Sequence, residues 1–153
     1  METCQQKKRR LFGRFHSMEK YLKELNRLLN VNKSKEDIWS IEESDASIER
    51  SKTLEWILLY KEIFPFNDKV HLKEILQNYI ETWDKPYRMF IPKSEDCGLV
   101  CISSLHEFNW DFNFYDESGG IICLERIDYK VRIILDYYED KKEYLEILIY
   151  NSL

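Results

Sequence analysis

Apolar residues recur at helical spacing in the first half of the chain. A helix is expected over residues 18–30, where Ser17 can cap the start and one face carries Tyr21, Leu22, Leu25, Leu28 and Leu29. The polar, acidic stretch 31–46 is expected to be a loop laid against the body of the protein. A second helix is expected from Ser47 to Phe64, because Leu54, Ile57 and Leu58 keep the same spacing and Pro65 cannot continue a helix.

The third expected helix has the clearest apolar stripe. Asn67 or Asp68 can cap it, and Pro86 marks the point where the chain leaves it. The residues of the stripe are Leu72, Ile75, Leu76, Tyr79, Ile80 and Trp83. A stripe of this kind is typical of a helix that faces the core of a domain.

After Pro86 the period of the pattern changes from about 3.6 to about 2, which predicts strands. Phe108, Trp110, Phe112 and Phe114 alternate with polar residues, so a strand with one aromatic face is expected over 108–115. Asp116 to Gly120 is expected to form a hairpin turn, since paired glycines accept positive φ angles. Further strands are expected over 87–91, 99–104, 121–127, 129–136 and 143–150, with a tight turn near Asp128 and another over 137–142.

Connections this short cannot hold crossover helices, so the sheet is expected to be largely antiparallel. Helices followed by strands predict an α+β fold in which N-terminal helices pack on a C-terminal β-meander. The length of 153 residues fits one domain, which we place over 17–153.

Residues 1–16 form the most basic part of the sequence. Five lysines and arginines stand against Glu2, which gives this segment a net charge of +4. The segment lies before the amphipathic pattern, so we expect a tail, disordered or an extension of the start site. A nucleic-acid-binding arm is an alternative for the run KKRR.

The rest of the chain is acidic. The net charge is −5, and residues 101–153 carry eleven acidic and five basic side chains. Such a body disfavours nucleic acid and anionic membranes and favours a basic protein partner, although it is also compatible with an ordinary solvated surface.

The four cysteines indicate free thiols in a reducing compartment, because no secretory signal pattern precedes them. No stretch approaches the roughly 18 apolar residues of a membrane span. We expect a cytoplasmic protein.

No pattern of residues predicts catalysis. Cys97, Cys101, His106 and Cys123 lack the paired knuckles of structural zinc, so we expect no metal and interpret the cysteines as small core residues. Cys101 with His106 could form a small thiol enzyme, but no oxyanion-hole motif accompanies them. Four glycines and no phosphate-binding motif argue against a nucleotide cofactor, and no cofactor or small-molecule ligand is expected.

The remaining signal is a surface of acids and tyrosines at two expected turns. Alternate turns of a meander lie at the same end of a sheet, so these turns are expected to adjoin and to bind a partner. On such a surface, acidic side chains would attract the partner and aromatic side chains would supply the contact area. The expected binding residues are Tyr115, Asp116, Glu117, Asp136, Tyr137, Tyr138, Glu139 and Asp140.

The acidic 106–140 region and the Ile/Lys/Asn/Tyr-rich composition resemble, in overall type, the immunity proteins of bacterial toxin systems, including contact-dependent growth inhibition. The resemblance spans 17–153 without a motif, and it assigns no residue a role. It implies a protein that binds one cognate toxin, often a basic nuclease, and blocks its active site. The basic segment 1–16 departs from that pattern.

Two other classes remain open. A phage or mobile-element inhibitor would use the same acidic surface against a host nucleic-acid-binding protein. The thiol enzyme based on Cys101 and His106 is the outlier.

Overall fold

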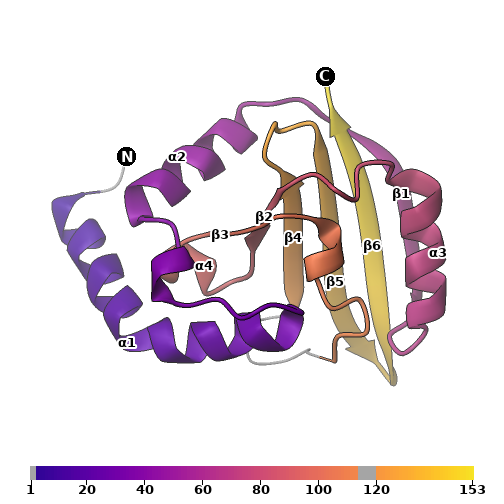
Figure 1. Ribbon diagram of the computed structural model, residues 1–153, viewed down its shortest axis with the longest axis horizontal. Coiled ribbons are helices and arrows are strands. Elements are labelled where there is room, and N and C mark those ends of the chain that lie inside the picture. The colour runs from indigo at the N-terminus through magenta and orange to yellow at the C-terminus, as the bar shows by residue number, and fades with distance from the viewer. Residues whose placement is uncertain (1–2, 114–119) are drawn as a thin grey trace.

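The computed structural model describes residues 3–113 and 120–153 and combines helices with one antiparallel sheet (Figure 1). The helices are α1 (Cys4–Leu28), α2 (Ile41–Lys52), α3 (Lys69–Tyr79) and the short α4 (Ser94–Cys97), with single 3-10 turns η1 (Lys35–Asp37) and η2 (Leu105–Glu107). The strands are β1 (Trp56–Pro65), β2 (Tyr87–Phe90), β3 (Val100–Ile102), β4 (Ile121–Arg126), β5 (Val131–Asp140) and β6 (Lys142–Ser152).

The six strands of the sheet lie in the order β1-β6-β5-β4-β2-β3, and every neighbouring pair is antiparallel. The expected α+β class is confirmed, and β4, β5 and β6 form the expected meander. The turn between β4 and β5 contains Asp128 and Tyr129, as expected, and Tyr129 adopts a positive φ of 62°.

The expected helix from Ser47 to Phe64 is wrong, because this stretch divides between α2 and β1. Helix α2 begins already at Ile41, inside the expected loop, where Ser40 accepts a hydrogen bond from the Glu43 amide. Strand β1 pairs along its length with β6, the last strand of the chain. This pairing joins segments about 90 residues apart, as the partners Trp56 and Ser152 show. A local sequence pattern therefore cannot predict it.

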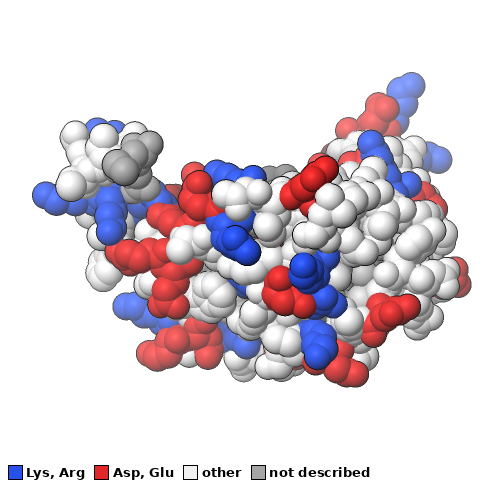
Figure 2. All heavy atoms as spheres, turned by 90° about the horizontal axis from the view of Figure 1, so that it is seen from above, with Lys and Arg blue, Asp and Glu red and all other residues white. Residues whose placement is uncertain are grey.

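The basic N-terminal segment is helical, so the expectation of a tail that precedes a helix at residue 18 is wrong. Thr3 caps α1, which then runs unbroken to Leu28. Arg10 donates two hydrogen bonds to the carboxylate of Asp45 in α2, at 2.9 and 2.8 Å. Lys7 forms an ion pair with Glu42 at 2.9 Å, and Arg14 donates to the Trp39 carbonyl at 3.1 Å. Figure 2 shows basic side chains at one end of the molecule beside a group of acidic ones. Basic side chains of α1 therefore join this helix to acidic side chains of α2.

The expected strand over 108–115 is wrong in its described part, but its buried face was predicted correctly. Phe108, Trp110 and Phe112 are all buried. Their backbone follows turns and contacts the end of α1 instead of another strand: the Asn109 amide donates to the Leu28 carbonyl at 2.7 Å. The alternation of aromatic and polar residues thus arises without a sheet ladder.

Helix α3 confirms the expected amphipathic stripe over Leu72, Ile75 and Leu76 only, because the helix ends at Tyr79, whose side chain is exposed, and Trp83 lies beyond it. Asp68 caps it by accepting from the His71 amide at 3.2 Å, and Leu72, Ile75 and Leu76 are buried. They share one core with Leu25 of α1 and with the buried residues of β5 and β6. We call the sheet side that faces this core the inner face and the opposite side the outer face.

A buried polar network holds α1, α2 and α4 at the β3 end of the sheet. The Tyr21 hydroxyl donates to the Gly98 carbonyl at 2.5 Å and contacts Ser94 Oγ at 2.8 Å. Ser44 of α2 accepts from the Leu99 amide at 2.9 Å. Gly98 has a φ of 107°, and a Cβ there would lie 2.3 Å from the Trp39 carbonyl oxygen, so this crossing requires glycine.

Candidate functional site

The second expected turn of the acidic, tyrosine-rich surface is a strand. Residues 136–140 continue β5, which pairs with β6 until the chain reverses at Lys141, whose φ is 64°. The expected turn over 137–142 is therefore wrong for residues 137–140, which continue β5, and the reversal itself takes place only at Lys141. The sequence YYEDKK suggested a turn because charged residues dominate it, but residues 138–142 form the solvent-exposed tip of a long hairpin.

Because side chains alternate along a strand, the five expected binding residues of β5 separate onto two faces. Asp136, Tyr138 and Asp140 belong to the outer face, whereas Tyr137 and Glu139 belong to the inner face. Tyr137 packs its ring edge-on against Phe66, with centroids 5.1 Å apart, so it serves the core. The other expected residues, Tyr115, Asp116 and Glu117, lie outside the described residues.

The strand register arranges the outer face near the hairpin in rows that cross β5, β6 and β1. Tyr138 lies opposite Tyr144, Asp136 opposite Glu146, and Ile134 opposite Leu148. On the far side of β6, Glu146 lies opposite Ile63, and Leu148 lies opposite Lys61. A row of tyrosines, a row with two carboxylates and a row of aliphatic side chains thus succeed one another. We call these eight residues the outer patch.

The two carboxylates at the centre of the outer patch are poorly compensated. Glu146 has a weak ion pair with Lys61 at 3.9 Å, whereas Asp136 forms no ion pair within the described part of the chain. Partial burial, with a contribution from Glu146, raises the pKa of Asp136 above its usual value. Like charges directly opposite each other destabilise a sheet, so this pair is an unfavourable arrangement for folding alone.

The tyrosine row borders these acids with a ready aromatic surface. The rings of Tyr138 and Tyr144 are stacked, with centroids 5.6 Å apart and planes 24° from parallel. Tyr138 is 37% exposed. Two stacked rings lose little conformational freedom when a partner covers them, which favours binding.

Strand β1 extends the outer patch with apolar side chains at the edge of the sheet. Leu58 and Ile63 are each 47% exposed, and Leu59 lies at a bulge between the paired residues Leu58 and Tyr60. The edge at β3 is different, because Ile38 bridges to Val100 and the Trp39 amide donates to the Leu99 carbonyl. Exposed apolar edges of this kind are usual sites of protein contact.

The candidate thiol pair is not assembled. Cys101 directs its thiol at the Ile102 carbonyl, whereas His106 packs on Trp83 and lies 3.5 Å from a carboxylate oxygen of Asp84. Burial raises the pKa of Cys101, the opposite of what a nucleophilic thiol requires. Burial likewise raises the pKa of Cys97 to about 11 and that of Cys123 to about 12. Across residues 3–113 and 120–153, no group of three or more His, Cys, Asp or Glu residues could hold a metal ion.

A histidine–carboxylate contact that the sequence did not predict joins α3 to β1. Glu62 accepts hydrogen bonds from the Tyr60 hydroxyl through one oxygen and from His71 Nε2 through the other. These bonds lower the pKa of Glu62 and raise that of His71. Tyr79 stacks on Tyr60 at 4.4 Å, and Phe64 meets His71 edge-on at 5.3 Å. These side chains join α3 to β1. They could be identified only once the strand register and the position of the helix were known.

Comparisons with protein-family models, with curated proteins and with solved structures found no match. Of the helices in the described residues, none has both the length and the apolar character needed to cross a membrane.

Proposed function

We propose that this chain is an immunity-type protein that binds one cognate bacterial toxin, a basic nuclease domain, and neutralises it by covering its active surface. It acts in the cytoplasm and catalyses no reaction. The observation that supports this proposal most strongly is the pair of opposed carboxylates, Asp136 and Glu146, at the centre of the outer patch with its tyrosine and aliphatic side chains. A lysine or arginine from a partner would relieve their repulsion at the moment of binding.

The composition of the outer patch supports a protein partner. Binding surfaces between proteins combine desolvated aromatic anchors with surrounding charges, and the anchors supply most of the affinity. Tyr138 and Tyr144 can fill the first role, and Asp136 and Glu146 can attract a basic surface before contact. The exposed Leu58 and Ile63 on β1 add apolar area beside them.

Nucleases that act on nucleic acid carry basic surfaces, because they must bind phosphate. An acidic chain that covers such a surface competes directly with the substrate. The net charge of −5 and the carboxylates of the outer patch are complementary to that target. The basic residues Lys7 and Arg10, which would oppose it, are already engaged with Glu42 and Asp45.

Affinity capture from the source cells tests this proposal when it compares two charge-matched variants. The first carries Asp136→Lys with Glu146→Lys. The control carries Glu19→Lys with Glu49→Lys, two acids whose side chains are 85% and 72% exposed on helices. We expect the wild type and the control to retain a basic protein that the first variant loses. That protein should be toxic when expressed alone and harmless when co-expressed with this chain.

Two results would refute the proposal. A captured protein that stays bound to both variants would place the interface elsewhere. A retained partner whose expression is harmless would exclude a toxin.

A further inference from the structure

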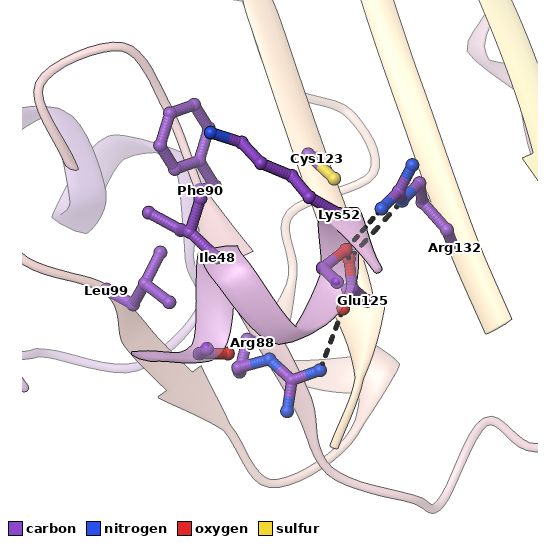
Figure 3. A pocket seen from close by; sticks show the side chains of 10 residues that line it. Ile48, Lys52, Arg88, Phe90, Leu99, Cys123, Glu125 and Arg132 are labelled. Carbon is purple, nitrogen blue, oxygen red and sulfur yellow. Dashed lines mark hydrogen bonds and ion pairs between the residues drawn. The ribbon is translucent and has the colours of Figure 1, made fainter. Parts of the chain in front are cut away.

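A cavity of about 200 Å³ lies between α2 and the outer face of the sheet, apart from the outer patch (Figure 3). Its floor comes from β2, β4 and β5, and its roof comes from Ile48 and Ser51 of α2. Ser47 and Ser51 lie on the buried side of α2. Side chains this small leave open space between the helix and the sheet.

The charged side of the cavity holds more positive than negative groups. Glu125 is its only acid among the described lining residues, and three basic residues, Lys52, Arg88 and Arg132, line it as well. Glu125 accepts from Arg88 at 3.0 Å through one oxygen. Through the other it accepts from Ser51 at 2.8 Å and from Arg132 Nε at 3.3 Å. Lys52 has an exposed ion pair with Glu49 at 3.5 Å. The single Glu125 carboxylate cannot neutralise both arginines, so the cavity favours an anion.

The arginines are held in place before any ligand arrives. Arg88 is 4% exposed, lies 3.9 Å from the centre of the Tyr129 ring and donates to the Ile127 and Arg126 carbonyls. Arg132 lies 4.1 Å from the centre of the Trp56 ring. Arg132 donates through Nε and one Nη nitrogen to Glu125 and Ser51, which leaves its second Nη nitrogen for a ligand. A guanidinium fixed in this way binds a carboxylate with little loss of side-chain freedom.

The other side of the cavity is apolar. Ile48, Phe90 and Leu99 lie there, and Figure 3 shows the Lys52 chain extending toward Phe90, whereas Cys123 lies nearer to Arg132 in this view. An apolar cavity of roughly 150 Å³ can hold benzene. The volume here therefore accommodates a ring of that size together with a carboxylate group.

We propose that this cavity binds a small carboxylate that carries a ring-sized apolar group, with the carboxylate at Arg132 and the ring between Ile48 and Phe90. The flexible Lys52 side chain would move from Glu49 to the bound carboxylate. This ligand site is separate from the outer patch, so it does not depend on the proposed toxin partner. The exposed Lys52 side chain, 67% accessible, would close over the bound ligand.

Titration with benzoate tests the proposal, with benzyl alcohol and benzylamine as probes of the same ring without the negative charge. The readout is the NMR signal of the Arg132 Nε–H group and the fluorescence of Trp56, which stacks on Arg132. We expect benzoate to bind with a Kd of about 1 mM and at least about 10-fold more tightly than either control compound.

Variants of the protein make the test specific. Arg132→Gln is expected to abolish benzoate binding. Lys52→Gln, at an exposed position that cannot endanger the fold, is expected to weaken binding about 3- to 10-fold. Lys8→Gln removes the same charge from the exposed side of α1 and should change nothing. Equal binding of benzoate and benzyl alcohol, no binding of benzoate, or full binding by Lys52→Gln would overturn the proposal.

Discussion

Asp136 on β5 and Glu146 on β6 lie directly opposite each other on the outer face of the sheet, and no described lysine or arginine pairs with Asp136. Partial burial, together with repulsion from Glu146, raises the pKa of Asp136. The folded protein therefore tolerates an arrangement that weakens it. This cost to stability has an explanation if a partner's cation completes the site.

Replacing Asp136 by asparagine is expected to stabilise the protein while weakening partner binding. Removal of a like-charge cross-strand pair should raise the free energy of unfolding by about 0.2–1 kcal/mol. The folded-state pKa of Asp136 is raised, so the folded protein binds this proton more tightly than the unfolded chain does. The stability that results is fully present below the unfolded pKa and is lost as pH rises through the folded pKa. Urea unfolding between about pH 3 and pH 7 measures both the gain in stability of the variant and the pH dependence of the wild type.

Asparagine at position 136 should remove that part of the pH dependence. Glu146→Gln is the matched control and should gain less stability, since it also removes the contact with Lys61. A loss of stability in Asp136→Asn would show that the carboxylate has a favourable structural role.

Arg10→Ala is expected to destabilise the protein, because Arg10 joins α1 to Asp45 and to the Glu95 carbonyl. Hydrogen bonds to charged groups contribute about 1.5–3 kcal/mol, and the Arg10 side chain is only 17% exposed. Thermal and urea unfolding measure the loss. Arg9→Ala removes a neighbouring exposed charge and should change stability by less than about 0.5 kcal/mol. Equal effects of the two substitutions would mean that the first turns of α1 do not dock.

Leu76→Ala is expected to cost about 2–5 kcal/mol of unfolding free energy, because it opens a cavity in the core. Leu76 is fully buried in the middle of the α3 stripe. The exposed neighbour Gln77→Ala should stay within about 0.5 kcal/mol. A change in the free energy of unfolding as small for Leu76→Ala as for Gln77→Ala would mean that α3 does not pack tightly on the core.

The contact between His71 and Glu62 predicts a loss of stability at mildly alkaline pH. The Glu62 hydrogen bond raises the pKa of His71, so the folded state holds the proton more tightly than the unfolded state. The resulting stability is fully present below the unfolded pKa of about 6.5 and is lost as pH rises through the folded value. His71→Gln keeps a donor but cannot titrate, so its unfolding should lack this pH dependence. A wild-type stability that stays flat from about pH 6 to pH 9 would contradict the assignment.

The sequence predicted those parts of the fold that depend on local patterns. Helix α3 was visible because Leu72, Ile75 and Leu76 repeat at helical spacing between a cap and a proline. The hairpin of β4 and β5 was visible because alternation surrounds a tight turn at Asp128. In both, the information lies within a few residues.

The errors occurred where partners are distant in sequence. Strand β1 contains a continuous apolar run that fits a helix or a strand, and only pairing with β6 decides between them. The first turns of α1 looked like a tail because their partners, Asp45 and the Glu95 carbonyl, come much later in the chain. The outer patch was predicted through Asp136 and Tyr138, but Glu146 and Tyr144 could be added only once the register of β5 and β6 was known.

Association kinetics with the cognate partner test the central claim most directly. Stopped-flow measurements at low salt would compare the wild type, the Asp136→Lys/Glu146→Lys variant and the Glu19→Lys/Glu49→Lys control. The double outer-patch variant keeps a like-charge pair between β5 and β6 but replaces the weak Glu146–Lys61 ion pair by repulsion, so its free energy of unfolding should fall by no more than about 1 kcal/mol. We expect its association to slow by about 10-fold or more, with added salt weakening the wild type much more than the variant, and the control to remain close to the wild type. Association by the outer-patch variant as fast as by the control would contradict the claim that this patch is the binding surface.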